Sequence, residues 1–156
     1  MEAKALEPVR ALEFGDGRAD QVYAKLRKLG LRLTPQRMAI VRYVMATESH
    51  PTADDVYRKV RDDYPTMSLT TVYTTLEMLV RAGIVQAVNT RKVVRYDSHL
   101  PRHLNLICLN CSKIIDVDDE DISGIANEKA GKFGFHIVDQ QFSIYGYCGD
   151  CRAQVP

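Results

Sequence analysis

The sequence has no apolar run near the roughly 18 residues that a membrane span requires. Its first twenty residues mix acidic and basic side chains and lack the apolar segment of a secretory signal. It also contains no internal repeat and no low-complexity segment. These absences favour a cytoplasmic protein without membrane contact, and 156 residues suffice for one larger domain or two small ones.

The net charge is only +1, but positive and negative side chains are unevenly distributed. Residues 17–96 contain 14 Lys and Arg against 7 Asp and Glu, whereas residues 97–156 contain 5 against 9. A basic first half suits a polyanionic partner such as DNA, and an acidic second half suits metal or partner binding. The alternative is a chance imbalance between solvated faces.

Cysteine is scarce, and its four copies form two Cys-x-x-Cys pairs separated by 36 residues: Cys108, Cys111, Cys148 and Cys151. Two such pairs can hold one Zn²⁺ in a closed, tetrahedral structural site, which here would join the beginning of a domain to its end. Disulfides are disfavoured in a cytoplasm. A thioredoxin-like redox pair is the weaker alternative, because that motif normally stands alone.

The first half shows four helical patterns. Residues 17–29 form the first, which Gly30 ends, and Thr34 caps the second with proline at its first position. Thr52 caps the third helix, and the fourth occupies residues 68–83.

The fourth helix has one apolar side and one polar side. Thr71, Tyr73 and Thr74 lie on or beside the polar side, with Tyr73 at the boundary. Small hydroxyls beside an aromatic ring suit a helix laid in the DNA major groove, where Tyr73 would contact thymine methyl groups. The alternative is an ordinary amphipathic helix.

Two short strands follow at residues 84–88 and 93–97, joined by a basic tip. Arg91 and Lys92 in this tip would neutralise DNA phosphates. Helices followed by a basic hairpin are the order of a winged helix-turn-helix, which we assign to residues 17–96 as a DNA-binding domain.

The pattern changes after a predicted hinge at residues 97–103. Residues 104–108 and 113–117 are predicted strands, acidic residues open a helix, and residues 135–147 are predicted as one long strand. Three strands and one helix make a thin core, so this sheet would need a partner. The predicted fold is thus α/β (α+β), with a winged helix followed by a small dimerisation and metal-binding domain at residues 104–156.

A second group of possible ligands combines nitrogen and oxygen donors: His50, Asp97, His103, Asn105 and Asp116. Such donors suit Fe²⁺ or Mn²⁺, with Zn²⁺ as the alternative. Because the donors come from both halves, one ion would fix the angle between the two halves. Against this, a single histidine is more often a packed or solvated side chain.

Five motifs together resemble the ferric uptake regulator family, a group of dimeric, metal-dependent bacterial repressors. They occupy residues 30–37, 50–57, 68–73, 103–111 and 145–151. The resemblance covers residues 20–152 and is strongest to the branch that responds to peroxide. It implies homodimers on double-stranded operator DNA, no enzyme activity, and a basic residue near the minor groove at Arg32.

The resemblance also implies the regulatory ligand set His50, Asp97, His103, Asn105 and Asp116. In the peroxide branch, bound Fe²⁺ reacts with hydrogen peroxide and oxidises a ligand histidine, His50 or His103, after which metal and DNA are released. Mn²⁺ would support DNA binding without this reaction. Asn105 departs from the family pattern, which has histidine there, so a weaker amide ligand is expected.

Two alternatives compete with this interpretation. The first is an iron- or manganese-responsive uptake repressor of the same family without peroxide chemistry. The second is a metallohydrolase built on His50, His103 and Asp116, which lacks an evident general base beside an open metal position.

Overall fold

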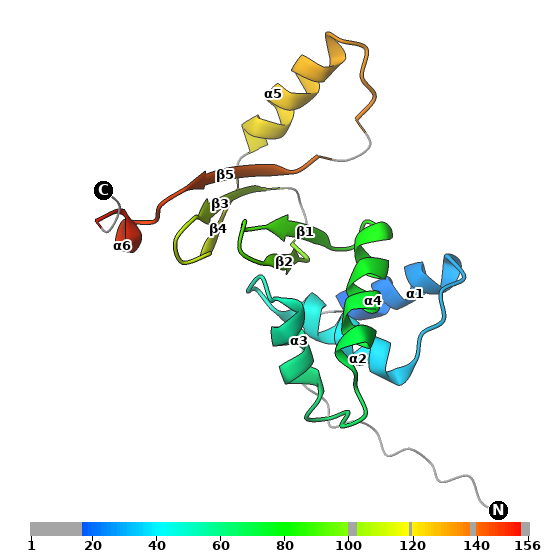
Figure 1. Ribbon diagram of the computed structural model, residues 1–156. Helices are drawn as coiled ribbons and strands as arrows, with labels where there is room; N and C mark the ends of the chain where they lie inside the picture. The colour runs from blue at the N-terminus through cyan, green and yellow to red at the C-terminus, as the bar shows by residue number, and fades with distance from the viewer. Residues whose placement is uncertain (1–16, 100–102, 119, 138–139, 154–156) are drawn as a thin grey trace, which may run out of the picture. The chain divides into compact units, whose positions relative to one another are not determined.

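The computed structural model describes residues 17–99, 103–118, 120–137 and 140–153 (Figure 1). The chain divides into two compact units, the first containing residues up to 87 together with 96–98, and the second containing 88–95 and 99 onward. Residues 100–102 of the predicted hinge lie outside the described residues. No helix within the described ranges is both long and apolar enough to cross a membrane.

Four helices build the first unit: α1 (Arg18–Lys28), α2 (Pro35–Ala46), α3 (Ala53–Val60) and α4 (Leu69–Arg81). Their starts follow from local chemistry. The side chains of Thr34, Thr52 and Ser68 each accept a hydrogen bond from the backbone N–H three residues later, as helix N-caps do. At Thr52 the bond is reciprocated by Asp55, which completes a capping box.

The helix ends and the core of the first unit also follow the sequence pattern. Gly30 and Gly83 have φ values of +72° and +61° after α1 and α4, a conformation that glycine adopts without steric cost. Apolar residues from all four helices form one core, in which Ile40, Leu76 and Leu79 are fully buried. The four-helix order predicted for this half is confirmed.

A two-stranded hairpin follows the helices, with β1 (Gln86–Asn89) paired to β2 (Val94–Asp97). At its tip, the Thr90 hydroxyl and backbone N–H both donate to the Val93 carbonyl, at 2.9 and 3.1 Å. The Arg91 N–H donates to Oδ1 of Asn89 at 2.8 Å, and Arg91 adopts a φ of +68°. Residues 88–95, which we call the wing tip, belong to the second unit.

The second unit is a three-stranded sheet with two helices: β3 (Leu104–Cys108), β4 (Ile114–Val117), α5 (Glu120–Gly131), β5 (Phe142–Gly146) and α6 (Gly149–Arg152). The strand order is β4-β3-β5, with β3 antiparallel to β4 and parallel to β5. Figure 1 shows α5 standing away from the sheet. The predicted α/β class, with a winged helix before a small mixed domain, is confirmed.

The prediction of one strand over residues 135–147 was wrong, because β5 begins at Phe142. The first part of that segment instead closes α5. Gly134 has a φ of +71°, and the Phe135 N–H donates to the Ala130 carbonyl at 3.1 Å, which is a helix-terminating bond. Phe133 and Phe135 are left 82% and 74% exposed.

The turn between β3 and β4 contains a strained serine. Ser112 has a φ of +60° and is buried, and its hydroxyl has no hydrogen-bond partner among the described residues. We expect Ser112→Gly to raise the free energy of unfolding by about 1 kcal/mol, since glycine adopts positive φ without the Cβ clash. Urea unfolding measures the change. Ser112→Ala is the control, because it removes the hydroxyl and keeps the strain; equal gains from both variants would contradict the role of backbone strain.

Candidate metal centres

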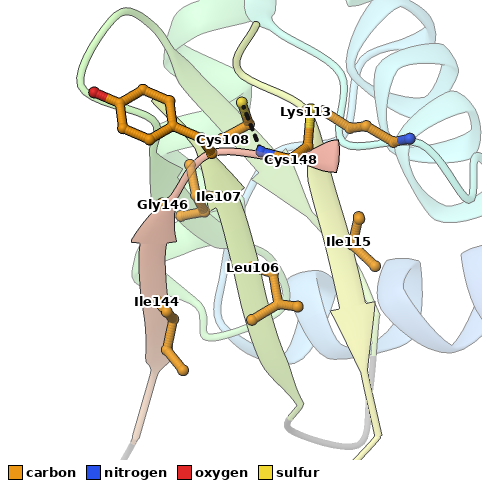
Figure 2. Close-up of a pocket in the computed structure, with 9 residues that line it drawn as sticks. Leu106, Ile107, Cys108, Lys113, Ile115, Ile144, Gly146 and Cys148 are labelled. Atoms are coloured by element: carbon orange, nitrogen blue, oxygen red, sulfur yellow. Dashed lines mark hydrogen bonds between the residues drawn. The ribbon is translucent and has the colours of Figure 1, made fainter. Parts of the chain in front are cut away.

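The sheet register brings the two cysteine pairs together. Cys108 ends β3 directly beside Gly146 at the end of the parallel strand β5, and Cys148 follows two residues later. Figure 2 shows Cys108 and Cys148 side by side, with the Cys148 N–H donating to Sγ of Cys108 at 3.4 Å. Cys148 then caps α6, which carries Cys151. Both pairs therefore begin at the same edge of the sheet.

The geometry of the four sulfur atoms fits one tetrahedral ion. All four thiols are reduced, and their sulfur atoms lie within 4.8 Å of one another. Sγ of Cys111 is 3.8 Å from Sγ of Cys148. A tetrahedral Zn²⁺ with bonds of about 2.3 Å requires sulfur–sulfur separations of about 3.8 Å. This cluster, buried at Cys108 and Cys151, has the closed form of a structural site.

Two thiols of the cluster differ in their acidity. Hydrogen bonds from the backbone N–H groups of Cys111 and Cys148 lower the pKa of Cys108 to about 6. The side chain of Asn110 lowers the pKa of Cys151, but hydrogen bonding among the neighbouring thiols and burial raise it to about 12. The cluster thus resists full deprotonation by itself, and a divalent ion would supply the charge that four thiolates need.

In the first unit, His50 and Asp97 form a buried pair, with Nε2 of His50 3.8 Å from Oδ1 of Asp97. Two hydrogen bonds hold the segments that carry them. The Tyr96 N–H donates to the Pro51 carbonyl at 2.9 Å, and the Ser98 hydroxyl donates to the Val44 carbonyl at 2.8 Å. The chain therefore presents an imidazole and a carboxylate at one place.

In the second unit, His103, Asn105 and Asp116 lie together on β3 and β4. Nε2 of His103 is 3.5 Å from Oδ1 of Asp116, and Asn105 is directly opposite Asp116 in the antiparallel register. Asn105 is fully buried, yet neither Oδ1 nor Nδ2 of its amide has a hydrogen-bond partner in the part of the chain described. A buried amide in this state is costly, and a ligated cation would relieve the cost at Oδ1.

These five side chains offer two imidazoles, two carboxylates and one amide, without sulfur. This donor set suits a hard or borderline divalent ion such as Mn²⁺ or Fe²⁺ and differs from the four-sulfur cluster.

The residues of the first unit that were predicted to contact DNA are exposed, except for Thr71. Tyr73 is 42% exposed on α4, and Thr74 is also exposed. Thr71 is half-buried, and its hydroxyl lies 2.8 Å from the Ser68 hydroxyl, which already caps the helix. Arg32 is exposed before α2, where its carbonyl accepts a hydrogen bond from Arg37.

Arg91 and Lys92 are exposed in the wing tip, and both contact other residues of the second unit, to which the tip belongs. The Arg91 guanidinium lies 4.8 Å from the centre of the Tyr145 ring, and the Lys92 ammonium donates to the Asn110 carbonyl. Sequence reasoning did not identify Tyr145 or Asn110 as partners of the wing. No local pattern could have done so, because the contacts join residues far apart in the chain.

Comparisons with known proteins agree on one family. Residues 28–145 match the model of the ferric uptake regulator family. Among curated proteins, a peroxide-responsive repressor of Staphylococcus epidermidis is 33% identical over 144 residues, which cover 92% of this chain and 96% of that protein.

Solved structures agree with this similarity. The chain resembles a peroxide-sensing gene regulator of Streptococcus pyogenes, with 34% identity, a TM-score of 0.50, and coverage of 86% of this chain and 93% of that one. It also resembles the ferric uptake regulator of Pseudomonas aeruginosa with manganese, with 26% identity, a TM-score of 0.72, and coverage of 81% and 97%.

Proposed function

This chain belongs to the ferric uptake regulator family of metal-responsive repressors, and we propose that it releases operator DNA when peroxide oxidises a histidine ligand of its regulatory ion. Members of this family are transcriptional regulators and not enzymes, which excludes the metallohydrolase alternative. The proposal of a regulatory site rests on the buried amide of Asn105, which lies beside His103 and Asp116 and has no hydrogen-bond partner among the described residues. As a DNA-binding regulator, the protein would act in the cytoplasm.

Two ions have different tasks in this proposal. Zn²⁺ bound by the four cysteines would hold the ends of β3 and β5 together, as their sulfur geometry supports. Fe²⁺ or Mn²⁺ would take its donors from His50, Asp97, His103, Asn105 and Asp116. Because these residues come from both units, the ion would select one arrangement of the units and thereby control DNA affinity.

When bound, Fe²⁺ would supply the chemistry by which hydrogen peroxide transfers one oxygen atom to an imidazole carbon, with water as the other product. The protein's own contribution is placement of that imidazole. His50 and His103 each lie within 4 Å of a carboxylate, at 3.8 and 3.5 Å, and both rings are buried. An oxygen added to either ring would therefore disturb a closely packed pair, and the ion would lose a ligand.

Mass spectrometry of the anaerobically prepared Fe²⁺ form after brief exposure to low peroxide tests this proposal. We expect one added oxygen on His50 or His103 and loss of DNA binding. The Mn²⁺ form is the matched control, and we expect its mass to stay unchanged and the protein to remain bound to DNA. If the Fe²⁺ form stayed unmodified and remained on DNA, the iron- or manganese-responsive uptake repressor would be the better assignment.

For DNA recognition we propose that α4 enters the major groove and that basic residues outside it contact the backbone. Tyr73 and Thr74 support this role by their exposure on one face of α4, with Thr71 at its start. Arg32 would contact the minor groove, and Arg91 and Lys92 would contact phosphates. Their role differs from that of Tyr73 because backbone contacts carry no base information.

Arg91→Ala and Tyr73→Ala should therefore weaken binding in different ways. Loss of one phosphate contact lowers affinity for every sequence and reduces the slope of log affinity against log salt by about 1. Loss of Tyr73 lowers discrimination between a duplex selected by the wild-type protein and a scrambled one, by about 1–3 kcal/mol. Fluorescence anisotropy with both duplexes measures each effect. Equal losses of specificity in the two variants would refute this division.

We also propose a homodimer, because the sheet of the second unit leaves an apolar face uncovered. Leu106, Ile115 and Ile144 lie across its three strands and line an open hollow (Figure 2). Ile115 is 42% exposed and Ile144 is 54% exposed. An apolar face of this kind is typical of a protein–protein interface.

A further inference from the structure

The wing tip makes three contacts with the rest of the second unit. The Arg91 guanidinium lies over the Tyr145 ring at 4.8 Å, a distance typical of a cation–π contact. The Tyr145 hydroxyl donates to the Asn89 carbonyl at 2.8 Å, and the Lys92 ammonium donates to the Asn110 carbonyl. One aromatic side chain and one backbone carbonyl thus contact Arg91 and Lys92, two of the three cations of the tip.

The two receiving groups are well fixed in the second unit. Tyr145 pairs with Ile107 in the parallel register of β3 and β5, on the same face of the sheet as Asn105. Asn110 lies between Cys108 and Cys111, in the turn that carries half of the sulfur cluster. This surface is therefore built by the sheet and by the sulfur cluster.

The wing tip itself has a conformation that suits a held segment. Arg91 adopts a positive φ, which is unfavourable for a side chain with a Cβ, and Thr90 beside it is fully buried. Residues that keep such a conformation do so because surrounding contacts determine it. Here those contacts include the hydrogen bond from the Arg91 N–H to Asn89 and the ring of Tyr145.

We infer that Tyr145 and Asn110 form an internal docking site for the wing tip that competes with DNA. Docking holds the Arg91 guanidinium face against the Tyr145 ring and engages one N–H of the Lys92 ammonium, so both cations must leave these contacts to reach phosphates away from this surface. Docking therefore lowers DNA affinity whenever the regulatory ion does not favour the DNA-bound arrangement. This inference rests on the proposed role of the wing in DNA binding and adds an autoinhibitory contact to it.

Tyr145→Ala in protein that retains zinc but lacks the regulatory ion tests the competition. A labelled duplex of random sequence is the probe, because phosphate contacts need no particular sequence. We expect Tyr145→Ala to bind about three- to tenfold tighter than wild type, the effect of losing one cation–π contact and one hydrogen bond. Tyr145→Phe keeps the ring beneath Arg91 and should show a smaller gain. If Tyr145→Ala does not fold, Tyr145→Val provides the same test.

A double variant identifies the competing cation. In an Arg91→Ala background, Tyr145→Ala should give at most a small residual gain, because the released cation is already missing. An undiminished gain in that background would overturn the assignment to Arg91.

Trypsin cleavage after Arg91 and Lys92 reports docking without DNA. Tyr145→Ala should be cut faster at these two sites, while cleavage after Lys129 of α5 should stay unchanged. Unchanged cleavage at the tip would overturn the docking site, and faster cleavage without tighter DNA binding would overturn the competition. If no variant bound DNA with or without Mn²⁺, the proposed function would fail, whereas the cleavage result would still decide whether the tip docks.

Discussion

Cys111→Ser should unfold the second unit while leaving the first unit folded. The side chain at this position is one of four sulfur donors within 4.8 Å of one another. A structural zinc site contributes about 10–16 kcal/mol of apparent binding free energy, which exceeds or equals the stability of a typical domain. The second unit has little else to replace it, since its sheet has three strands and α5 stands away from it.

The first unit should survive because its core contains none of the second unit's residues. All of its buried apolar members come from residues 23–85 and Tyr96. Zinc content, circular dichroism and hydrogen exchange together measure the outcome: loss of zinc, partial loss of helix signal, and rapid exchange confined to the second unit.

Cys111→His is the matched control at the same position. Cys111 is exposed, so an imidazole has room there, and three cysteines with one histidine are a common zinc ligand set. This variant should keep its zinc and its fold. If Cys111→Ser kept wild-type zinc content and wild-type hydrogen exchange, the cluster would not be the structural zinc site of the unit. Redox pairing of the thiols would then be the better interpretation.

The helical half was largely predictable because its boundaries are set by local chemistry. Thr34, Thr52 and Ser68 cap their helices through bonds within three residues, and Gly30 and Gly83 end helices through their own backbone freedom. Such signals need no knowledge of the rest of the fold.

The errors and omissions arose where distant contacts or competing local signals decide the structure. Alternating residues before Phe142 indicated a strand, but Gly134 and the bond from Phe135 to Ala130 use that backbone to close α5. The docking of the wing tip on Tyr145 had no sequence signal at all.

The proposed regulatory ligands were an intermediate case. The sequence placed His103, Asn105 and Asp116 in one group of possible ligands, and the cross-strand pairing of Asn105 with Asp116 brings two of them together. The sequence could not reveal that the Asn105 amide is fully buried without a hydrogen-bond partner among the described residues, because burial depends on how the whole unit packs.

That buried amide leads to a prediction in which stability and metal affinity change in opposite directions. Asn105→Leu replaces two polar groups, which have no hydrogen-bond partner in the described part of the chain, with apolar groups of the same branching. The protein without its regulatory ion should gain about 2 kcal/mol of unfolding free energy, because an unsatisfied buried group costs about 1–3 kcal/mol. Affinity for Mn²⁺ should fall at least tenfold, since even residues that only support ligands contribute about 10- to 100-fold.

Urea unfolding without the regulatory ion and calorimetric titration with Mn²⁺ measure the two changes. Asn105→His is the matched control, because it keeps a donor, and a stronger one, at the same place; its Mn²⁺ affinity should equal or exceed that of wild type. If Asn105→Leu stabilised the protein but bound Mn²⁺ normally, the amide would not be a ligand. If it destabilised the protein, the amide would have a partner in solution, and the main support for a regulatory ion at this position would be lost.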